Sequence, residues 1–337
     1  MATTICMFNH KGGVSKTTTA FALSWMLAEK GRTVVLVDAD SQCNLSSIAL
    51  GEDEFERLTT EQPERNFKGA LAPAFEAKPI PLQPVELIEV SARPGLYVLP
   101  GSFDLSQYEV SLGVSFTLTD TMSTLKNLPG SFAYLLAVTA EKYDADYVIV
   151  DMNPSLSAIN EALFVSCDYF IVPTAPDNFS TMAIKSLATV LPRWEKWAIR
   201  ARDVLSDASY PLPNVKPKFL GSVVQRFNIR KGKPTQANQA AIDRLSTAVR
   251  EELVPALSEV GMTLDHYPME GYCLVSIPEF HTLNAQYHEH GVPVFALTDA
   301  QLGRVGTVLA QYQETREKFR KLFSDFADLV IKLTGNA

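Results

Sequence analysis

Residues Asn9–Thr18, NHKGGVSKTT, lie between a short apolar stretch and a segment with helical spacing. The apolar stretch, Thr4–Phe8, is β-prone, and Thr17–Glu29 has helical spacing before Gly31, a residue type that commonly ends helices. A second apolar stretch, Thr33–Asp38, has the unbroken hydrophobicity typical of a strand buried in a parallel sheet. The order strand, glycine-rich loop, helix, strand predicts a βαβ unit built around this loop.

The loop has residues suited to binding phosphate. Gly12 and Gly13 let the backbone curl close to an anion, and the start of the following helix carries a partial positive charge. Lys16 is placed to reach the β and γ phosphates of a nucleotide, and Thr17 to put a hydroxyl on Mg²⁺. Thr18 is placed to donate to the next phosphate along.

The loop departs from the usual pattern G-x-x-x-x-G-K-[ST], because His10 and Ser15 stand where that pattern has glycine. Ser15 adds a Cβ beside the expected phosphates. An ordinary backbone conformation at Ser15 would cost little, whereas a positive φ would store strain of about 1–3 kcal/mol. The sequence leaves both conformations open.

Two apolar stretches end in aspartate. Asp151 follows Tyr147–Val150, and the stretch that begins at Thr33 ends in Asp38-Ala39-Asp40. A phosphoryl-transfer site needs a carboxylate to support the Mg²⁺ shell and a group to orient the attacking water. Aspartates are also common as plain polar ends of strands, but the loop and both aspartates in this order favour a nucleotide site.

Further β-prone stretches alternate with helical ones, at residues 95–100, 147–151, 169–173 and 219–225. This alternation predicts an α/β fold, a P-loop NTPase with a mostly parallel central sheet flanked by helices on both faces. We expect one domain over residues 1–337.

Two segments interrupt the alternation. Residues 52–90 contain five prolines and are predicted to form an irregular insertion, and residues 192–218 a second insertion. Residues 300–337 are predicted to form a C-terminal helical segment.

Composition narrows the class of protein. The chain has 337 residues and a net charge of −8, so any binding to nucleic acid needs a local basic patch. The four cysteines are scattered, and we expect reduced, mostly buried thiols in a cytoplasmic protein. The N-terminus shows no signal peptide, and no apolar run reaches the roughly 18 residues of a membrane span.

Taken together, these motifs resemble the ParA/MinD family of deviant Walker A ATPases. Lys11–Thr18 matches the family's KGGxGK[ST], and Leu36–Asn44 is similar to its DxDPQxN segment. Tyr147–Ser155 is similar to its Walker B segment. Ser15 is the departure, and it raises a question about the rate of hydrolysis more than about binding.

The resemblance implies a slow ATPase that acts as a switch with ATP and Mg²⁺. It implies a nucleotide site formed by Lys11, Gly12, Gly13, Val14, Ser15, Lys16, Thr17, Thr18, Arg226 and Pro278. Lys11 would reach the phosphates of the partner subunit in an ATP-bound homodimer, Lys16 would stabilise phosphate charge, and Asp40 would orient the attacking water. Thr17 would bind Mg²⁺, with support from Asp151 through water.

The same resemblance implies nonspecific binding of double-stranded DNA by the ATP dimer, and hydrolysis stimulated by a ParB-like or other protein partner. Two basic clusters are candidate phosphate contacts, although charge runs are commonly just solvated. The first cluster is Arg226, Arg230, Lys231 and Lys233. The second cluster is Arg316, Lys318, Arg320 and Lys321.

Three alternatives remain. Residues 319–333 have an apolar helical face of the kind that anchors MinD to membranes, but we favour a helix docked on the core. Electron delivery, as in relatives of nitrogenase iron protein, would need thiolates grouped around a cluster, and the scattered cysteines argue against it. The third is a nucleotide switch that acts only through protein partners.

Overall fold

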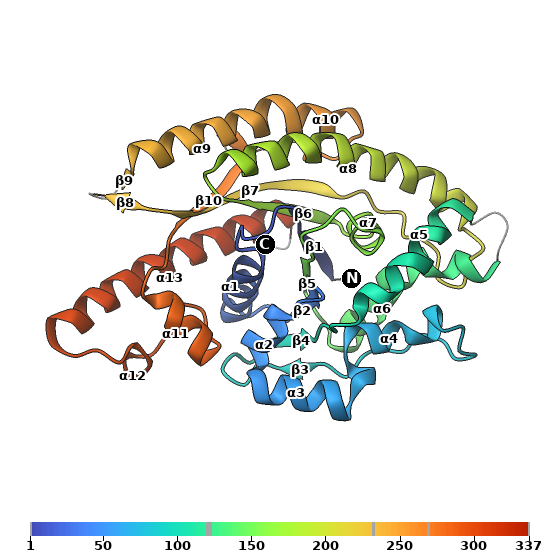
Figure 1. The fold of residues 1–337 in the computed structure, drawn as a ribbon, viewed down its shortest axis with the longest axis horizontal. Coiled ribbons are helices and arrows are strands. Elements are labelled where there is room, and N and C mark those ends of the chain that lie inside the picture. Colours follow the sequence, from blue (N-terminus) through green and yellow to red (C-terminus); the bar gives the residue numbers. More distant parts are fainter. Residues whose placement is uncertain (1, 119–122, 231–232, 268–269, 336–337) are drawn as a thin grey trace.

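The computed structural model describes residues 2–118, 123–230, 233–267 and 270–335. Its centre is an eight-stranded sheet in the order β10-β7-β6-β1-β5-β2-β4-β3 (Figure 1). These strands are β1 (Thr3–Met7), β2 (Val34–Ala39), β3 (Ile88–Glu89), β4 (Leu96–Leu99), β5 (Tyr147–Met152), β6 (Tyr169–Thr174), β7 (Lys218–Phe227) and β10 (Cys273–Pro278). The β3–β4 pair is antiparallel and the other pairs are parallel, which confirms the predicted fold class.

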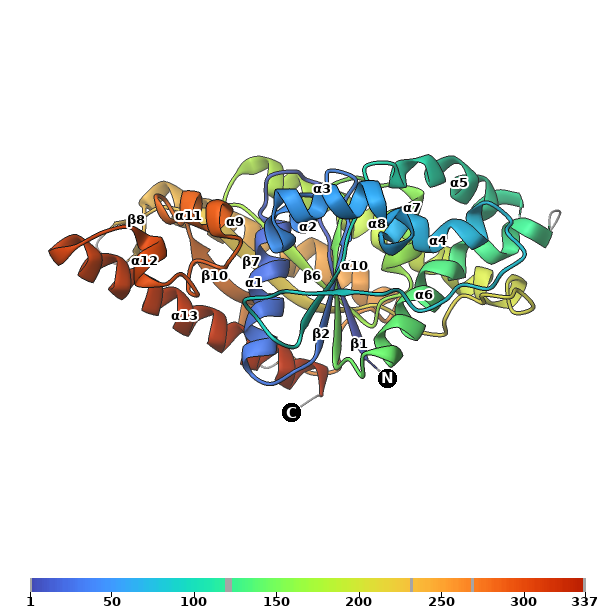
Figure 2. The ribbon, with the colours of Figure 1, turned by 90° about the horizontal axis from the view of Figure 1, so that it is seen from below.

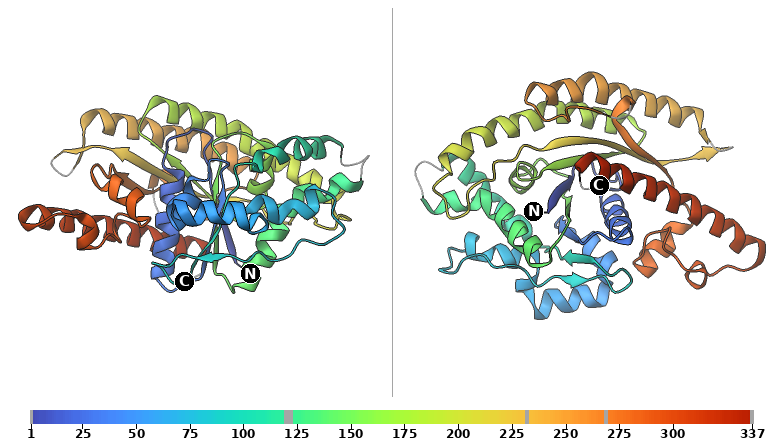
Figure 3. Two further views of the ribbon diagram at one scale, coloured as in Figure 1. Left: turned by 60° about the horizontal axis from the view of Figure 1, so that its bottom comes forward. Right: turned by 180° about the vertical axis from the view of Figure 1, so that it is seen from behind.

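Helices cover both faces of the sheet (Figure 3). One face carries α1 (Lys16–Glu29), α2 (Asn44–Leu50), α11 (Leu283–His290), α12 (Asp299–Leu302) and α13 (Gly306–Thr334). The other carries α4 (Phe67–Phe75), α5 (Glu109–Leu118), α6 (Leu128–Lys142), α7 (Ala158–Phe164), α8 (Asn178–Val204), α9 (Gln236–Ala248) and α10 (Val254–Glu259). Alternate residues of each central strand feed the two cores: Ile5 and Met7 point to the first face, and Cys6 to the second.

Strand register brings the predicted motifs to one edge of the sheet. Met7 of β1 lies opposite Asp151 of β5, and Asp38 of β2 lies opposite the same Asp151. The loop after β1 and the carboxylates that end β2 and β5 therefore emerge together. In Figure 2 the start of β1 and the end of α13 lie at the opposite, lower edge.

The prediction that residues 52–90 are irregular is wrong for the first part of this segment. Residues 52–61 form α3 (Glu52–Glu61), whose acidic first turn suits a helix N-terminus, and residues 67–75 form α4. The Asn66 side chain caps α4 by accepting from the Gly69 N–H at 2.8 Å. The prolines do not prevent helices here, because Pro63 stands where a short helix begins and Pro73 lies near the end of α4.

The predicted insertion at residues 192–218 is also partly helical. α8 continues through Pro192 to Val204, and residues 205–217 then lead to β7. Burial explains why α8 continues: Trp194 is 2% exposed, and the fully buried Glu195 pairs with Arg202 at 3.2 Å. Proline disfavours a helix interior, but tertiary packing overrides that preference here.

The expectation of four separate thiols is wrong for two of them, because Cys6 and Cys167 form a disulfide. They are 161 residues apart, so their spacing gives no signal. Parallel pairing of β1 with β6 brings them together, and the Asp168 N–H donates to the Thr4 carbonyl at 3.1 Å. Cys43 and Cys273 are free thiols.

The C-terminal helix α13 packs its apolar face on the body of the protein. Phe323, Phe326 and Val330 are at most 1% exposed, within the core that also contains α1. Among the described residues, no helix combines the length and hydrophobicity needed to span a bilayer. The face that a membrane anchor would use is occupied by the protein's own core.

Replacing Phe323 by alanine tests this packing. The change removes a fully buried ring, so the free energy of unfolding should fall by about 3–5 kcal/mol in denaturant titration. Val305→Ala is the matched control, because Val305 is 84% exposed next to the same helix and should cost no more than about 0.5 kcal/mol. Equal small effects would mean that α13 is not docked in solution.

Candidate nucleotide-binding site

The glycine-rich loop joins β1 to α1 and is anchored at its start. The Asn9 side chain donates to the Pro173 carbonyl at 2.8 Å and accepts from the Lys11 N–H at 2.9 Å. Gly13 has φ of 70°, a conformation that glycine adopts without strain. The loop is therefore tied to the end of β6 through Asn9 and turns at Gly13 before α1 begins at Lys16.

A cavity of about 620 Å³ opens beside this loop, within the range of small-ligand sites. From the loop and α1 it is lined by Gly12, Gly13, Val14, Ser15, Lys16, Thr17 and Thr18. From the segment after β2 it is lined by Asp40, Gln42, Asn44, Ser47, Ile48 and Glu52. Pro154 lies after β5, Gln225 and Arg226 belong to β7, and the remaining side is Pro278, Glu279, Phe280, Asn284 and His288.

Lys16 lines the cavity, and the buried Asp151 at the end of β5 interacts with it electrostatically. Lys16 is 7% exposed and Asp151 is 1% exposed. Burial lowers the pKa of Lys16, and the carboxylates of Asp151 and Asp40 oppose that shift. Burial and the neighbouring Asp38 raise the pKa of Asp151 to about 8, while Thr17 and Lys16 act in the opposite direction.

The Asp151 carboxylate fits a hydrated magnesium ion. Neither of its oxygens has a hydrogen-bond partner of good geometry among the described residues, and a buried carboxylate without such partners is costly. Within the described part of the chain, no group of three or more His, Cys, Asp or Glu could hold a metal ion alone. A magnesium ion here would therefore depend on Thr17, on phosphate oxygens and on water bound to Asp151; when bound, it would neutralise phosphate charge.

Asp40 is held at the cavity wall by polar neighbours. Its carboxylate accepts from the Gln42 N–H at 3.0 Å and from the Asn153 amide at 3.4 Å. Asp38 is instead structural: it accepts from the Ser46 N–H at 2.8 Å and the Ser46 hydroxyl at 2.6 Å. Asp40 is thus left facing the cavity, where it can orient a water molecule.

The structure settles the conformation of Ser15. Its φ of 55° and ψ of 38° are left-handed, so the strained alternative holds. Its side chain makes no capping hydrogen bond to α1. Its carbonyl accepts from the Thr19 hydroxyl at 2.7 Å and from the Gln225 amide at 3.2 Å. These contacts hold the backbone in a conformation that glycine would adopt more easily.

Arg226 and Pro278, for which nucleotide contacts are predicted, both border the cavity. Arg226 donates to the Gly13 carbonyl at 3.0 Å and pairs with Glu279 at 3.5 Å. Arg226 therefore bridges the loop and the segment after β10.

Lys11 is placed differently from the other predicted residues. Its ammonium group pairs with Asp177 at 2.5 Å and donates to the Ser180 hydroxyl at 3.2 Å, so it points to the start of α8 and not into the cavity. Sequence reasoning missed Asp177, Gln225 and Asn153. Asp177 could have been recognised as a helix N-cap, because aspartate is a favoured N-cap residue. Its carboxylate accepts a hydrogen bond from the Ser180 N–H at 2.7 Å.

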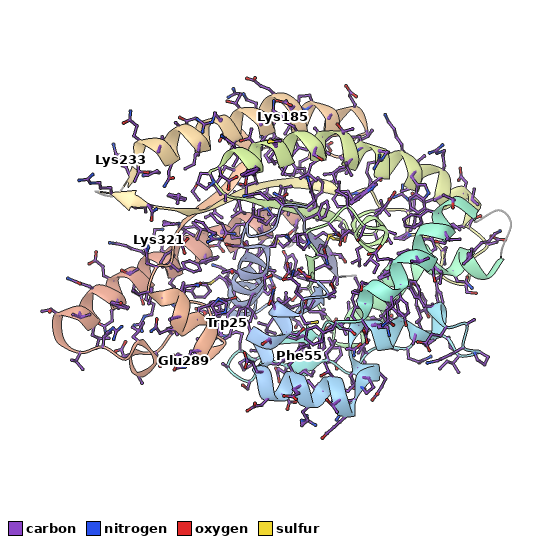
Figure 4. All side chains as sticks on the ribbon, in the orientation of Figure 1. Trp25, Phe55, Lys185, Lys233, Glu289 and Lys321 are labelled. Carbon is purple, nitrogen blue, oxygen red and sulfur yellow. A yellow bond between two sulfur atoms is a disulfide. The ribbon has the colours of Figure 1, made fainter. Side chains whose placement is uncertain are left out.

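The two predicted basic clusters differ in their pairing. In the first, Arg230 and Lys233 are exposed on the hairpin of β8 (Ile229–Arg230) and β9 (Lys233–Pro234), where Lys233 projects from the body (Figure 4). Lys231 lies outside the described residues. In the second, each cation pairs with a carboxylate: Arg316 with Asp299, Lys318 with Glu314, Arg320 with Glu29, and Lys321 with Asp325.

Replacing Ser15 by glycine should relieve the strain. We expect the free energy of unfolding to rise by about 1 kcal/mol, because the strain removed exceeds the entropy cost of glycine. Gly13→Ala is the reciprocal control and should lower stability by about 1 kcal/mol at its φ of 70°. Loss of stability in the Ser15 variant would contradict this account, and a large rise in ATP turnover would show that the natural loop slows hydrolysis.

The sequence of this chain matches a family model and several known proteins. A family model described as an AAA domain matches residues 2–200. The chromosome partitioning protein ParA of Caulobacter vibrioides is 28% identical over 193 residues, covering 56% of this chain and 62% of that protein. An uncharacterized protein of Methanocaldococcus jannaschii is 26% identical over 258 residues, covering 77% of this chain and 83% of that protein.

Solved structures show the same fold. A protein of Corynebacterium diphtheriae, 20% identical, superposes with a TM-score of 0.72 and covers 98% of each chain. ParA of pNOB8 bound to nonspecific DNA, 18% identical, superposes with a TM-score of 0.61 over 100% of this chain and 99% of that one. The chain therefore belongs to the AAA-domain family of P-loop ATPases, of the ParA/MinD type.

Proposed function

We propose that this protein is a slow, switch-type ATPase: Mg-ATP drives it into a homodimer, the dimer binds DNA without sequence preference, and hydrolysis releases it. The observation that carries the proposal is the cavity itself, which is lined by the glycine-rich loop with Lys16 and by Asp40, with the buried Asp151 close enough to Lys16 to interact electrostatically. Lys16 stabilises phosphate charge, Thr17 and Asp151 support Mg²⁺, and Asp40 orients the attacking water.

The proposed dimer uses the surface around Lys11. Phe179 and Met182, in the first turns of α8, are 71% and 64% exposed, and Leu156 after β5 is 44% exposed. Exposed apolar side chains of this size near a charged site favour burial against a second copy. In the dimer, Lys11 exchanges Asp177 for the phosphates held by the partner subunit.

The proposed DNA contacts lie on the β8–β9 hairpin. Arg230 and Lys233 are exposed there and make no ion pair with a described residue, so both are free to meet phosphates. Each cation of the second basic cluster pairs with a nearby carboxylate, and this cluster is not part of the proposal. ParA of pNOB8, which has the same fold, is bound to nonspecific DNA in its structure, and this supports DNA binding as part of the proposed function.

A ParB-like or other protein partner would stimulate hydrolysis, and the cargo would be a plasmid, a chromosome region or another assembly. The protein would act in the cytoplasm, associated with the nucleoid. Attachment to a membrane through α13 is disfavoured because its apolar face is buried.

Two variants separate nucleotide binding from hydrolysis. Lys16→Ala should abolish ATP binding in a calorimetric titration, because it removes the buried charge that faces the phosphates. Asp40→Ala should bind ATP with unchanged affinity but release phosphate at least about 10-fold more slowly, because it loses the group that orients water. Asp243→Ala, an exposed carboxylate on α9, is the control and should match the wild type. ATP affinity retained in the Lys16 variant, or unchanged turnover in the Asp40 variant, would remove that residue from its role.

DNA binding is tested with random-sequence duplex at two salt concentrations, with Mg-ATP, with Mg-ADP and without nucleotide. We expect binding with Mg-ATP alone, weakening steeply as salt rises. The double variant Arg230→Ala/Lys233→Ala should bind more weakly, whereas Lys318→Ala/Lys321→Ala, which changes paired surface lysines, should bind like the wild type. No binding in any state would favour a switch that acts on proteins alone, and equal loss in both double variants would contradict the assignment to the hairpin.

A further inference from the structure

Helix α11 carries a buried tyrosine against the nucleotide cavity. Asn284 and His288, one turn apart on this helix, line the cavity rim. Between them, Tyr287 turns inward and is 1% exposed, with its ring centroid 6.3 Å from that of Phe21 on α1. The ring thus lies between α11 and the helix that begins at the glycine-rich loop.

The Tyr287 hydroxyl lacks a hydrogen-bond partner of good geometry among the described residues, although it is fully buried. Buried tyrosine hydroxyls are usually satisfied, so an unsatisfied one needs an explanation. Its polar surroundings come from the nucleotide site: burial raises the pKa of Tyr287, the Thr18 hydroxyl opposes that rise, and the charge of Asp151 adds to it. Thr18 itself lines the cavity.

The end of α11 is fixed against the segment that follows Asp40. Gly291 has φ of 60°, and a Cβ at this position would lie 2.5 Å from the Ile48 carbonyl oxygen of α2. The lack of a side chain at Gly291 therefore lets the end of α11 pack closely against α2. Tyr287 is thus carried by a helix whose end is packed on the segment that lines the cavity.

We propose that Tyr287 is a positioning residue of the nucleotide site, whose hydroxyl holds the Thr18 hydroxyl toward the α phosphate of a bound nucleoside di- or triphosphate. A bound phosphate orders the Thr18 side chain and brings the two hydroxyls into a hydrogen bond. The inference rests on the proposed nucleotide function and adds to it a residue that lies 269 positions away in sequence, the difference between 287 and 18. No part of the glycine-rich motif indicates it.

The test compares the affinities of the wild type, Tyr287→Phe, Thr18→Val and the double variant for Mg-ATP and Mg-ADP. Tyr287→Phe keeps the ring and removes only the hydroxyl, so the fold should be preserved. We expect each single variant to bind both nucleotides about 3- to 10-fold more weakly, as for the loss of one hydrogen bond. The loss of affinity should be the same for ATP and ADP, because both contain the α phosphate. The double variant should bind no more weakly than the single variant with the lower affinity.

Tyr210→Phe is the matched control. Tyr210 is buried on the other face of the sheet, and its hydroxyl accepts from the Leu82 N–H at 2.9 Å, so its loss should lower the thermal midpoint without changing nucleotide affinity. Wild-type affinity in Tyr287→Phe, or losses that multiply in the double variant, would overturn the inference while leaving the proposed function intact. A wild type that binds neither nucleotide would overturn the proposed function and the inference together.

Discussion

The parallel register of β1, β5 and β2 is the constraint on which the site depends. It sets Met7 and Asp38 on either side of Asp151, so the glycine-rich loop and two strand-end carboxylates meet at one edge of the sheet. The register is fixed because both faces of these strands are buried, and a shift of one residue would exchange the two cores. Packing on the faces thereby places the chemistry at the edge.

The same edge holds two locally unfavourable features. Asp38 is fully buried but satisfied by Ser46, whereas Asp151 is equally buried and has no hydrogen-bond partner of good geometry among the described residues. Ser15 adopts a left-handed conformation that glycine would adopt more easily. Such violations of local preference gather at functional sites, where a ligand completes the arrangement. The water shell of a bound Mg²⁺ would supply the partners that the Asp151 carboxylate lacks among the described residues, and bound phosphate would face Lys16.

The fold class and the contiguous motifs could be predicted from the sequence, because unbroken apolar strands and a glycine-rich loop are local signals. Prediction failed where the structure depends on packing between residues far apart in the chain. The helices within residues 52–75 were not predicted because the prolines of this segment indicated irregular structure. The Cys6–Cys167 disulfide was not predicted because it depends on two parallel strands far apart in sequence. Contacts such as Lys11 with Asp177 join residues with no shared motif, so only the fold brings them together.

Sedimentation of the wild-type protein tests most directly whether the bound nucleotide controls dimer formation. The protein would be sedimented at one concentration without nucleotide, with Mg-ADP, and with Mg and a non-hydrolysable ATP analogue. We expect a monomer in the first two states, because Lys11 stays with Asp177, and a dimer with the analogue, because a γ phosphate recruits Lys11 from the partner. The same sedimentation coefficient in all three states would contradict control of assembly by the nucleotide.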